Sequence, residues 1–296
     1  MTPTQNELTY SYYPGCSLHA SGKEYDISTK GLFRVLKIGL QEVPDWICCG
    51  ATPAHNVDEL LSLSLCAKNL ALAENVAGDL AVSCAACFSR LKATKHKLAA
   101  NDVKRQQVAQ AIDGPVSLGK PVKHLLEILA KDYGLDRLAA AVQKPLADLK
   151  VACYYGCLLT RPPEVPELDC VEAPTIMERV IEAAGANTVP WSHRMECCGA
   201  NFTLSRPGVV LKLSNEILAS AQRSGADCII VACPLCHGNL DIRQKEIEEA
   251  SGTRYNMPVF YITQLLALAV GVSPGRLALD SMIVDPKPLL KEKGLL

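Results

Sequence analysis

The order of hydrophobic and polar residues along the chain predicts short strands that alternate with longer helices. Apolar residues recur at helical spacing over residues 57–74, 174–185 and 211–223. Short apolar runs of strand length occupy residues 10–13, 79–83, 121–123, 151–155, 227–232 and 258–261. This alternation is typical of α/β units, so we expect a fold with mainly parallel sheets.

The chain follows one plan twice. Residues 10–16 (YSYYPGC) match 151–157 (VACYYGC), residues 79–84 (DLAVSC) match 227–233 (DCIIVAC), and residues 120–129 (KPVKHLLEIL) match 257–266 (MPVFYITQLL). Three matched elements in the same order indicate an internal duplication. We therefore predict two pseudo-symmetric α/β lobes, an N-terminal domain over residues 1–148 and a C-terminal domain over residues 149–296.

Ten of the fourteen cysteines fall into two copies of one spacing pattern. The first copy reads C-x31-CCG-x33-C-x2-C and the second reads C-x39-CCG-x33-C-x2-C. Each C-x2-C pair follows a predicted strand at a strand-to-helix turn, where outward-pointing backbone N–H groups favour anionic sulfur. We expect the cysteines at the strand ends of each lobe to converge on one metal site. The candidate ligands are Cys16, Cys48, Cys49, Cys84 and Cys87 in the first half, and Cys157, Cys197, Cys198, Cys233 and Cys236 in the second.

Composition and charge indicate which partners and which cell compartment to expect. The net charge of −1 over 296 residues predicts no basic face for nucleic acid. The N-terminus lacks the basic and apolar segments of a secretion signal, and the apolar run at residues 265–272 is too short to span a bilayer. We therefore expect a cytoplasmic protein, a compartment in which cysteine-rich motifs more often bind metals than form disulfides.

Ligation by thiolates alone restricts the metal to zinc or an iron–sulfur cluster. A structural zinc site takes four ligands, usually from two short knuckles, whereas each half offers five cysteines. Four cysteines also suffice for an ordinary cubane cluster. The spacing therefore favours an iron–sulfur site of unusual shape, with zinc in one or both halves as the alternative.

The doubled five-cysteine pattern, with its Tyr-Pro-Gly-Cys and Tyr-Gly-Cys leads, strongly resembles the B-type subunit of heterodisulfide reductase and its homologues. The resemblance covers nearly the whole chain. It implies that each five-cysteine set binds a noncubane [4Fe-4S] cluster and that the two clusters face each other across a pseudo-twofold axis. It also implies a small-molecule disulfide clamped between the clusters. Electrons would arrive from a C-type subunit with cubane clusters, itself supplied by a flavin-containing A-type subunit.

The resemblance implies a catalytic subunit that reduces a disulfide or oxidises two thiols. Two alternatives remain open. One is a CCG-type electron-transfer subunit of another oxidoreductase, acting with a quinone or an organic acid, and the other is a structural zinc-binding assembly module. The first alternative is disfavoured because no ferredoxin-type C-x2-C-x2-C-x3-C run is present in the chain, although many such relatives carry one. The same absence implies a partner subunit with its own clusters.

Further residues near the motifs have candidate roles. His237, His193 and His55 lie close to the cysteines in sequence and are candidate proton donors to product thiolates; an ordinary, partly exposed loop histidine is the favoured alternative for each. Arg161 and Arg206 follow Cys157 and the second CCG, and an arginine there would pair with an acidic substrate group. Of the four cysteines outside the pattern, Cys66 and Cys228 are best explained as small buried hydrophobic residues. The other two are Cys153 and Cys170, and we prefer Cys157 to Cys153 as a ligand because of its Gly-Cys context.

Overall fold

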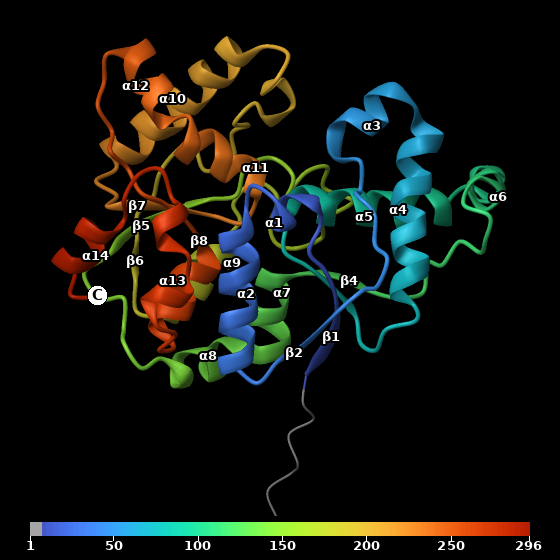
Figure 1. Ribbon diagram of the computed structural model, residues 1–296, viewed down its shortest axis with the longest axis horizontal. Helices are drawn as coiled ribbons and strands as arrows, with labels where there is room; N and C mark the ends of the chain where they lie inside the picture. Colours follow the sequence, from blue (N-terminus) through green and yellow to red (C-terminus); the bar gives the residue numbers. More distant parts are fainter. Residues whose placement is uncertain (1–7) are drawn as a thin grey trace, which may run out of the picture.

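The computed structural model describes residues 8–296 and shows two lobes, each built on a four-stranded parallel sheet (Figure 1). The strand orders are β2-β1-β3-β4 and β6-β5-β7-β8, which correspond term by term. The prediction of two α/β lobes with parallel sheets is therefore confirmed. No helix within residues 8–296 is long and apolar enough to cross a membrane. The expectation that the N-terminus carries no secretion signal concerns residues 1–7, which lie outside the described residues.

The first lobe alternates strands with helices. Its elements are β1 (Thr9–Tyr13), α1 (Cys16–His19), α2 (Lys23–Val35), β2 (Gly39–Glu42), α3 (Ala51–Val57), α4 (Glu59–Ala73), β3 (Leu80–Val82), α5 (Ala85–Ala99), α6 (Asp102–Ala111), β4 (Val122–His124), α7 (Leu125–Glu127), the π-helix η1 (Ile128–Gly134) and α8 (Leu135–Ala141).

The second lobe repeats this order with shorter helical pieces after the C-x2-C motif. Its elements are β5 (Lys150–Tyr154), α9 (Ile176–Glu182), β6 (Asn187–Thr188), the 3-10 helix η2 (Ala200–Phe202), α10 (Pro207–Arg223), β7 (Cys228–Val231), α11 (Pro234–His237), the π-helix η3 (Gly238–Ile242), α12 (Gln244–Ser251), β8 (Val259–Tyr261), α13 (Ile262–Ala269), the 3-10 helices η4 (Pro274–Arg276) and η5 (Leu279–Ser281), and α14 (Lys287–Glu292).

Local sequence explains the main elements. Every residue of β3 and β7 is buried, as expected for central parallel strands that are covered on both faces. Helix α4 begins after Asp58, whose carboxylate accepts the backbone N–H of Leu61 at 2.6 Å and so caps the first turn. Helix α10 begins four residues before the predicted start at 211, because Pro207 occupies a first-turn position that suits its fixed backbone.

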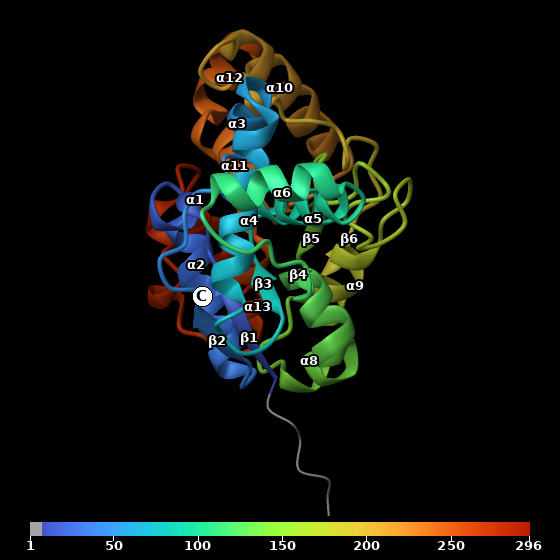
Figure 2. The same ribbon diagram turned by 90° about the vertical axis from the view of Figure 1, so that its right-hand side faces the viewer.

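The two lobes share one hydrophobic core. Helices α2 and α13 lie side by side between the sheets (Figures 1 and 2). At this contact the Tyr25 ring stacks on the Tyr261 ring, with centroids 4.2 Å apart, and Ser28 Oγ lies 2.7 Å from Thr263 Oγ1. Buried side chains of both halves form one contiguous cluster. The relative position of the lobes is therefore set by packing along their whole contact.

His124, at the end of β4, joins the lobes where the C-x2-C motifs begin. Its Nδ1 accepts a backbone N–H at 3.2 Å, so Nε2 carries the proton and donates to the Ser83 carbonyl oxygen at 2.9 Å. The Ala232 carbonyl, from the second lobe, also interacts with this imidazole and favours its protonated form. Ser83 and Ala232 directly precede Cys84 and Cys233. Burial lowers the pKa of His124 to about 4, which keeps the imidazole neutral in this role.

We expect this buried histidine to make the fold sensitive to acid. The folded pKa of His124 lies below the ordinary 6.5, so between these values the unfolded chain binds the proton more strongly. Stability is therefore lost as the pH falls from 6.5 towards 4. Between pH 7 and pH 4.5, the free energy of unfolding of the wild type should fall by about 2 kcal/mol more than that of His124→Gln, whose side chain does not titrate. Urea unfolding under anaerobic conditions measures the free energy of unfolding of both proteins at each pH. If the difference in free energy between them were the same at pH 7 and pH 4.5, the neutral buried state of His124 would be contradicted.

Candidate metal centre

The five cysteines of the first set meet at one edge of the first sheet. Cys16 opens α1 directly after β1, and its Sγ lies 3.4 Å from that of Cys48. The Sγ atoms of Cys49 and Cys87 are 3.3 Å apart, and Cys84 in turn hydrogen-bonds Cys87. Three segments far apart in sequence therefore converge, as their placement after successive parallel strands predicts.

The second set repeats this arrangement. The Sγ atoms of Cys157 and Cys197 are 3.9 Å apart, and those of Cys198 and Cys236 are 3.7 Å apart. All five cysteines of the set, Cys233 included, line one cavity of about 70 Å³. The longer x39 spacing of this half does not prevent convergence, because the extra residues form the loop between β5 and α9.

The CCG glycines shape the turn that brings backbone N–H groups to sulfur. Gly50 and Gly199 both have φ of 77°, in the left-handed region. Their N–H groups lie 3.4 Å from Cys48 Sγ and 3.3 Å from Cys197 Sγ. A Cβ on Gly50 would lie 2.5 Å from the Cβ of Ala54, so both the backbone angle and the available space require glycine there.

In each set the first cysteine of the CCG motif, Cys48 or Cys197, accepts hydrogen bonds that favour its thiolate form. We call this cysteine and its partner, Cys16 or Cys157, the outer pair of the set. In the second set, the hydrogen bond that Cys197 accepts from Cys157 is the largest cause that lowers the pKa of Cys197 to about 6, and backbone N–H groups lower it further. The same hydrogen bond raises the pKa of Cys157. In the first set, the pKa of Cys48 is lowered by its bond from Cys16, and that of Cys16 is raised. Each outer pair thus holds one readily ionised sulfur, the form that binds metals.

The two sets meet where the lobes meet. Cys84 and Cys233, the first cysteines of the two C-x2-C motifs, are both buried and lie close enough for each to shift the pKa of the other. Beside them, the backbone N–H of Ala85 donates to the Ala232 carbonyl oxygen at 3.2 Å, across the boundary between the lobes. The sites are therefore adjacent and share an inner wall.

The donor atoms suit soft metals. Two thiolates on one tetrahedral metal, with bonds of about 2.3 Å, are about 3.8 Å apart, close to the spacing of the paired sulfurs here. A donor set of thiolates alone suits zinc or iron–sulfur clusters. Within residues 8–296, no group of three or more Cys, His, Asp or Glu side chains has the geometry to hold a single metal ion. The sulfurs are arranged instead as neighbouring pairs.

The candidate histidines do not gather around the sulfurs. His237 is buried behind Cys236, where its ring stacks on Tyr261 with centroids 4.3 Å apart and its Nδ1 lies 3.9 Å from a Glu24 carboxylate oxygen. Burial lowers the pKa of His237 to about 4, so its imidazole is neutral near pH 7. His193 is half-buried and His55 is exposed on α3. The roles of these three histidines as proton donors stay predictions.

Arg161 and Arg206 are both exposed, and neither lines the cavity of the second set. The arginine that does line it is Arg90 of α5, three residues after the first C-x2-C motif. Asn239 holds the same position after the second motif and donates to the carbonyl oxygen of Cys198 at 3.1 Å. Neither residue was predicted from the sequence, although their shared offset from the two motifs was a signal that could have found them.

None of the four remaining cysteines pairs with a sulfur of either set, although Cys66 packs behind the first set. Cys66, Cys153 and Cys228 are fully buried in α4, β5 and β7, as expected for small hydrophobic residues, and Cys170 is exposed in the loop after β5. Cys157 therefore joins the second set through its contact with Cys197, while Cys153 stays within its strand.

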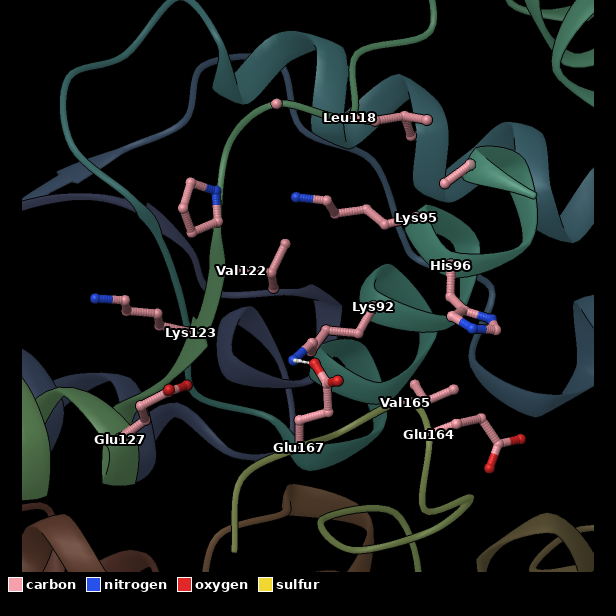
Figure 3. Close-up of a pocket in the computed structure, with 13 residues that line it drawn as sticks. Lys92, Lys95, His96, Leu118, Val122, Lys123, Glu127, Glu164, Val165 and Glu167 are labelled. Carbon is pink, nitrogen blue, oxygen red and sulfur yellow. Dashed lines mark hydrogen bonds and ion pairs between the residues drawn. The ribbon is translucent and has the colours of Figure 1, made fainter. Parts of the chain in front are cut away.

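A larger pocket of about 500 Å³ lies away from the sulfurs, between α5, β4 and the loop at residues 164–167 (Figure 3). Its wall includes the ion pair between Lys92 and Glu167, 3.3 Å apart, which joins the two lobes. Lys95, Lys123 and Glu164 also line it, and no cysteine does. Because side chains of both charges line this open pocket, we interpret it as solvated surface and not as a ligand site.

A solved structure, the crystal structure of a hypothetical protein from Helicobacter pylori, has the same fold. The two align with a TM-score of 0.76 and 13% sequence identity over 95% of this chain and 53% of that chain. This chain thus spans about half the length of that protein. The likeness shows the fold alone.

Sequence relatives show the family. A model of the cysteine-rich domain named CCG matches residues 10–92 and 151–241. The 8-methylmenaquinol:fumarate reductase membrane anchor subunit of Wolinella succinogenes is 33% identical over 95% of this chain and 98% of its own length. The B-type subunits of CoB-CoM heterodisulfide reductases from Methanosarcina acetivorans and Methanosarcina mazei are 31% and 30% identical, each with 93% of both chains covered. The resemblance noted from the cysteines is thereby confirmed: with two CCG domains, this chain belongs to the family that includes the B-type subunits of heterodisulfide reductases.

Proposed function

We propose that this protein is the disulfide-handling subunit of an oxidoreductase complex of the heterodisulfide reductase type, acting in the cytoplasm. It reduces a small-molecule disulfide to two thiols, or carries out the reverse oxidation. Membership of the CCG family and relatives named as subunits of reductases support an oxidoreductase role.

Each five-cysteine set would hold one noncubane [4Fe-4S] cluster. The first uses Cys16, Cys48, Cys49, Cys84 and Cys87, and the second uses Cys157, Cys197, Cys198, Cys233 and Cys236. The clusters supply electrons one at a time and an iron that accepts a thiolate. The protein contributes paired sulfurs, N–H groups from the glycine turns and a buried inner wall.

The observation that carries the proposal is the contact between Cys84 and Cys233. Cleavage of a disulfide bond takes two electrons and two protons and gives two thiols. Two one-electron sites on either side of the sulfur–sulfur bond meet this requirement without release of a thiyl radical. A single one-electron site would have to hold the half-reduced intermediate until a second electron arrived.

The electrons must come from outside the chain. Its sequence holds no ferredoxin-type C-x2-C-x2-C-x3-C run. A C-type subunit with cubane clusters, supplied by a flavin-containing A-type subunit, would deliver them. These partners follow from the family and remain part of the proposal.

A second function is favoured by one comparison. The relative from Wolinella succinogenes, at 33% identity, is named for 8-methylmenaquinol and fumarate and not for a disulfide. Under this alternative the same two sites pass electrons between a quinol and a partner subunit. The cysteine geometry suits both functions, and the substrate distinguishes them.

We expect about eight irons and eight acid-labile sulfides per chain in protein prepared without oxygen, as two four-iron clusters require. Cys49→Ser and Cys198→Ser should each remove about half of the iron, because each change deletes a ligand of one set. Chemical iron, sulfide and zinc analysis measures this.

Cys170→Ser is the matched control for these variants, since Cys170 is exposed and outside both sets. It should leave the iron content unchanged. Stoichiometric zinc with little iron, persisting after cluster reconstitution, would overturn the redox function and leave a structural zinc module.

The iron-loaded protein should oxidise reduced methyl viologen when a disulfide such as cystine is added. A thiol such as 2-mercaptoethanol should change the EPR signal of the mildly oxidised protein, because product thiolates bind at the sites. Turnover with menadione, without turnover or an EPR response with disulfides and thiols, would favour the quinol function instead.

A further inference from the structure

Arg90 belongs to the first lobe but lies in the wall of the second metal site. It sits on α5, whose first turn carries Cys87. Helix α5 starts at the boundary between the lobes, near α11 (Figure 1). The cavity lined by the five cysteines of the second set is also lined by Arg90 and by Ala85, both from the first lobe. The second site is therefore completed by a side chain from the other half of the chain.

The charge of Arg90 has no counter-charge among the described residues. Its Nε is buried and has no hydrogen-bond partner within residues 8–296. Arg194 and Arg243, by contrast, are each paired with a carboxylate, at 3.5 Å and 3.1 Å. The other residues that line the cavity include no carboxylate. The Arg90 side chain is half-buried and lines a cavity together with five sulfurs, so its positive charge lies where it stabilises negative charge held there.

The two lobes differ at this position. Asn239, the counterpart of Arg90 after the second C-x2-C motif, is neutral, and its hydrogen bonds are made within the second lobe. Its Nδ2 donates to the Cys198 carbonyl oxygen at 3.1 Å and lies 3.5 Å from Cys198 Sγ, and its Oδ1 accepts from Thr203 at 3.1 Å. The second site thus receives an amide donor from Asn239 as well as the guanidinium of Arg90.

The charge of Arg90 also reaches the first lobe. The charge of Arg90 reaches Cys66, which packs behind the first set with its Sγ 3.5 Å from the Cys49 carbonyl oxygen. This contact is with a cysteine outside the set. Because electrostatic stabilisation falls with distance and with intervening protein, the cavity that Arg90 lines should respond most.

We propose that Arg90 makes the two sites unequal by stabilising negative charge at the second one. This inference rests on the proposed function, in which each set holds an iron–sulfur cluster. Positive charge and N–H donors near such a cluster favour its reduced form and raise its reduction potential. The second site is therefore reduced first, and it is the better site for an anionic thiolate product.

Redox titrations of single-cluster proteins, followed by EPR, test this inference. Cys49→Ser leaves the second cluster and Cys198→Ser leaves the first, and each is compared with and without Arg90→Gln. Loss of the charge should shift the one-electron equilibrium of the second cluster towards the oxidised form about tenfold, equivalent to about 59 mV. The first cluster should shift clearly less.

Three further proteins keep the result interpretable. Arg90→Lys retains the charge and should keep the potential of the second cluster near the wild-type value, so it separates charge from packing. Arg254→Gln removes an exposed charge outside the cavity and should shift neither cluster. Arg90→Gln in the otherwise unchanged chain should bring the midpoint potentials of the two clusters closer together. This measurement tests the inference even if a serine variant fails to fold.

An unchanged second cluster in Arg90→Gln, or a larger shift at the first cluster, would overturn the inference while leaving the proposed function intact. Failure of the wild-type chain to take up iron would instead remove the proposed function, and the inference with it. Iron content and thermal unfolding of each variant are measured in parallel, so that a loss of cluster is not mistaken for a change in potential.

Discussion

The two C-x2-C motifs lie against each other at the boundary between the lobes, and this packing places the two cysteine sets side by side. Cys84 and Cys233 lie close together because β3 and β7 both end at the boundary between the lobes, where the Ala85 N–H donates to the Ala232 carbonyl oxygen and the neutral imidazole of His124 donates to the Ser83 carbonyl oxygen. If the lobes shifted relative to each other, the two cysteine sets would separate, and the proposed two-electron reaction between them would be lost. The shared core around α2 and α13 holds this contact in place.

Within each lobe, sulfur is held by backbone geometry more than by side chains. The left-handed glycine of each CCG motif turns its N–H group towards the outer cysteine, and the C-x2-C pair sits at the start of a helix, where N–H groups are unpaired. Both devices place positive partial charge beside sulfur without a titratable group. They occur in both halves, so the duplicated plan places paired sulfurs in the same surroundings twice.

The duplication is not perfect, and its departures lie close to the sites. Arg90 and Asn239 stand at equivalent positions with different charge, and α5 continues as one long helix where the second lobe has α11, η3 and α12. A symmetric substrate would not need such differences. An unsymmetrical disulfide, or an ordered sequence of electron transfers, would make use of them.

The sequence by itself determined the parts of the fold and site that depend on local pattern. Alternating strands and helices, the duplication and the ten matched cysteines were all readable, because backbone preference and motif spacing are properties of short segments. It did not indicate Arg90, because a single arginine on a polar helix face looks like a solvated residue until the other lobe covers it. It placed His237 next to a ligand, yet the fold turns that ring onto Tyr261 in the interior. Tertiary structure alone decided that the two sites touch and that one carries a charge from the opposite lobe, because both facts arise from how the lobes pack together, which no segment encodes alone.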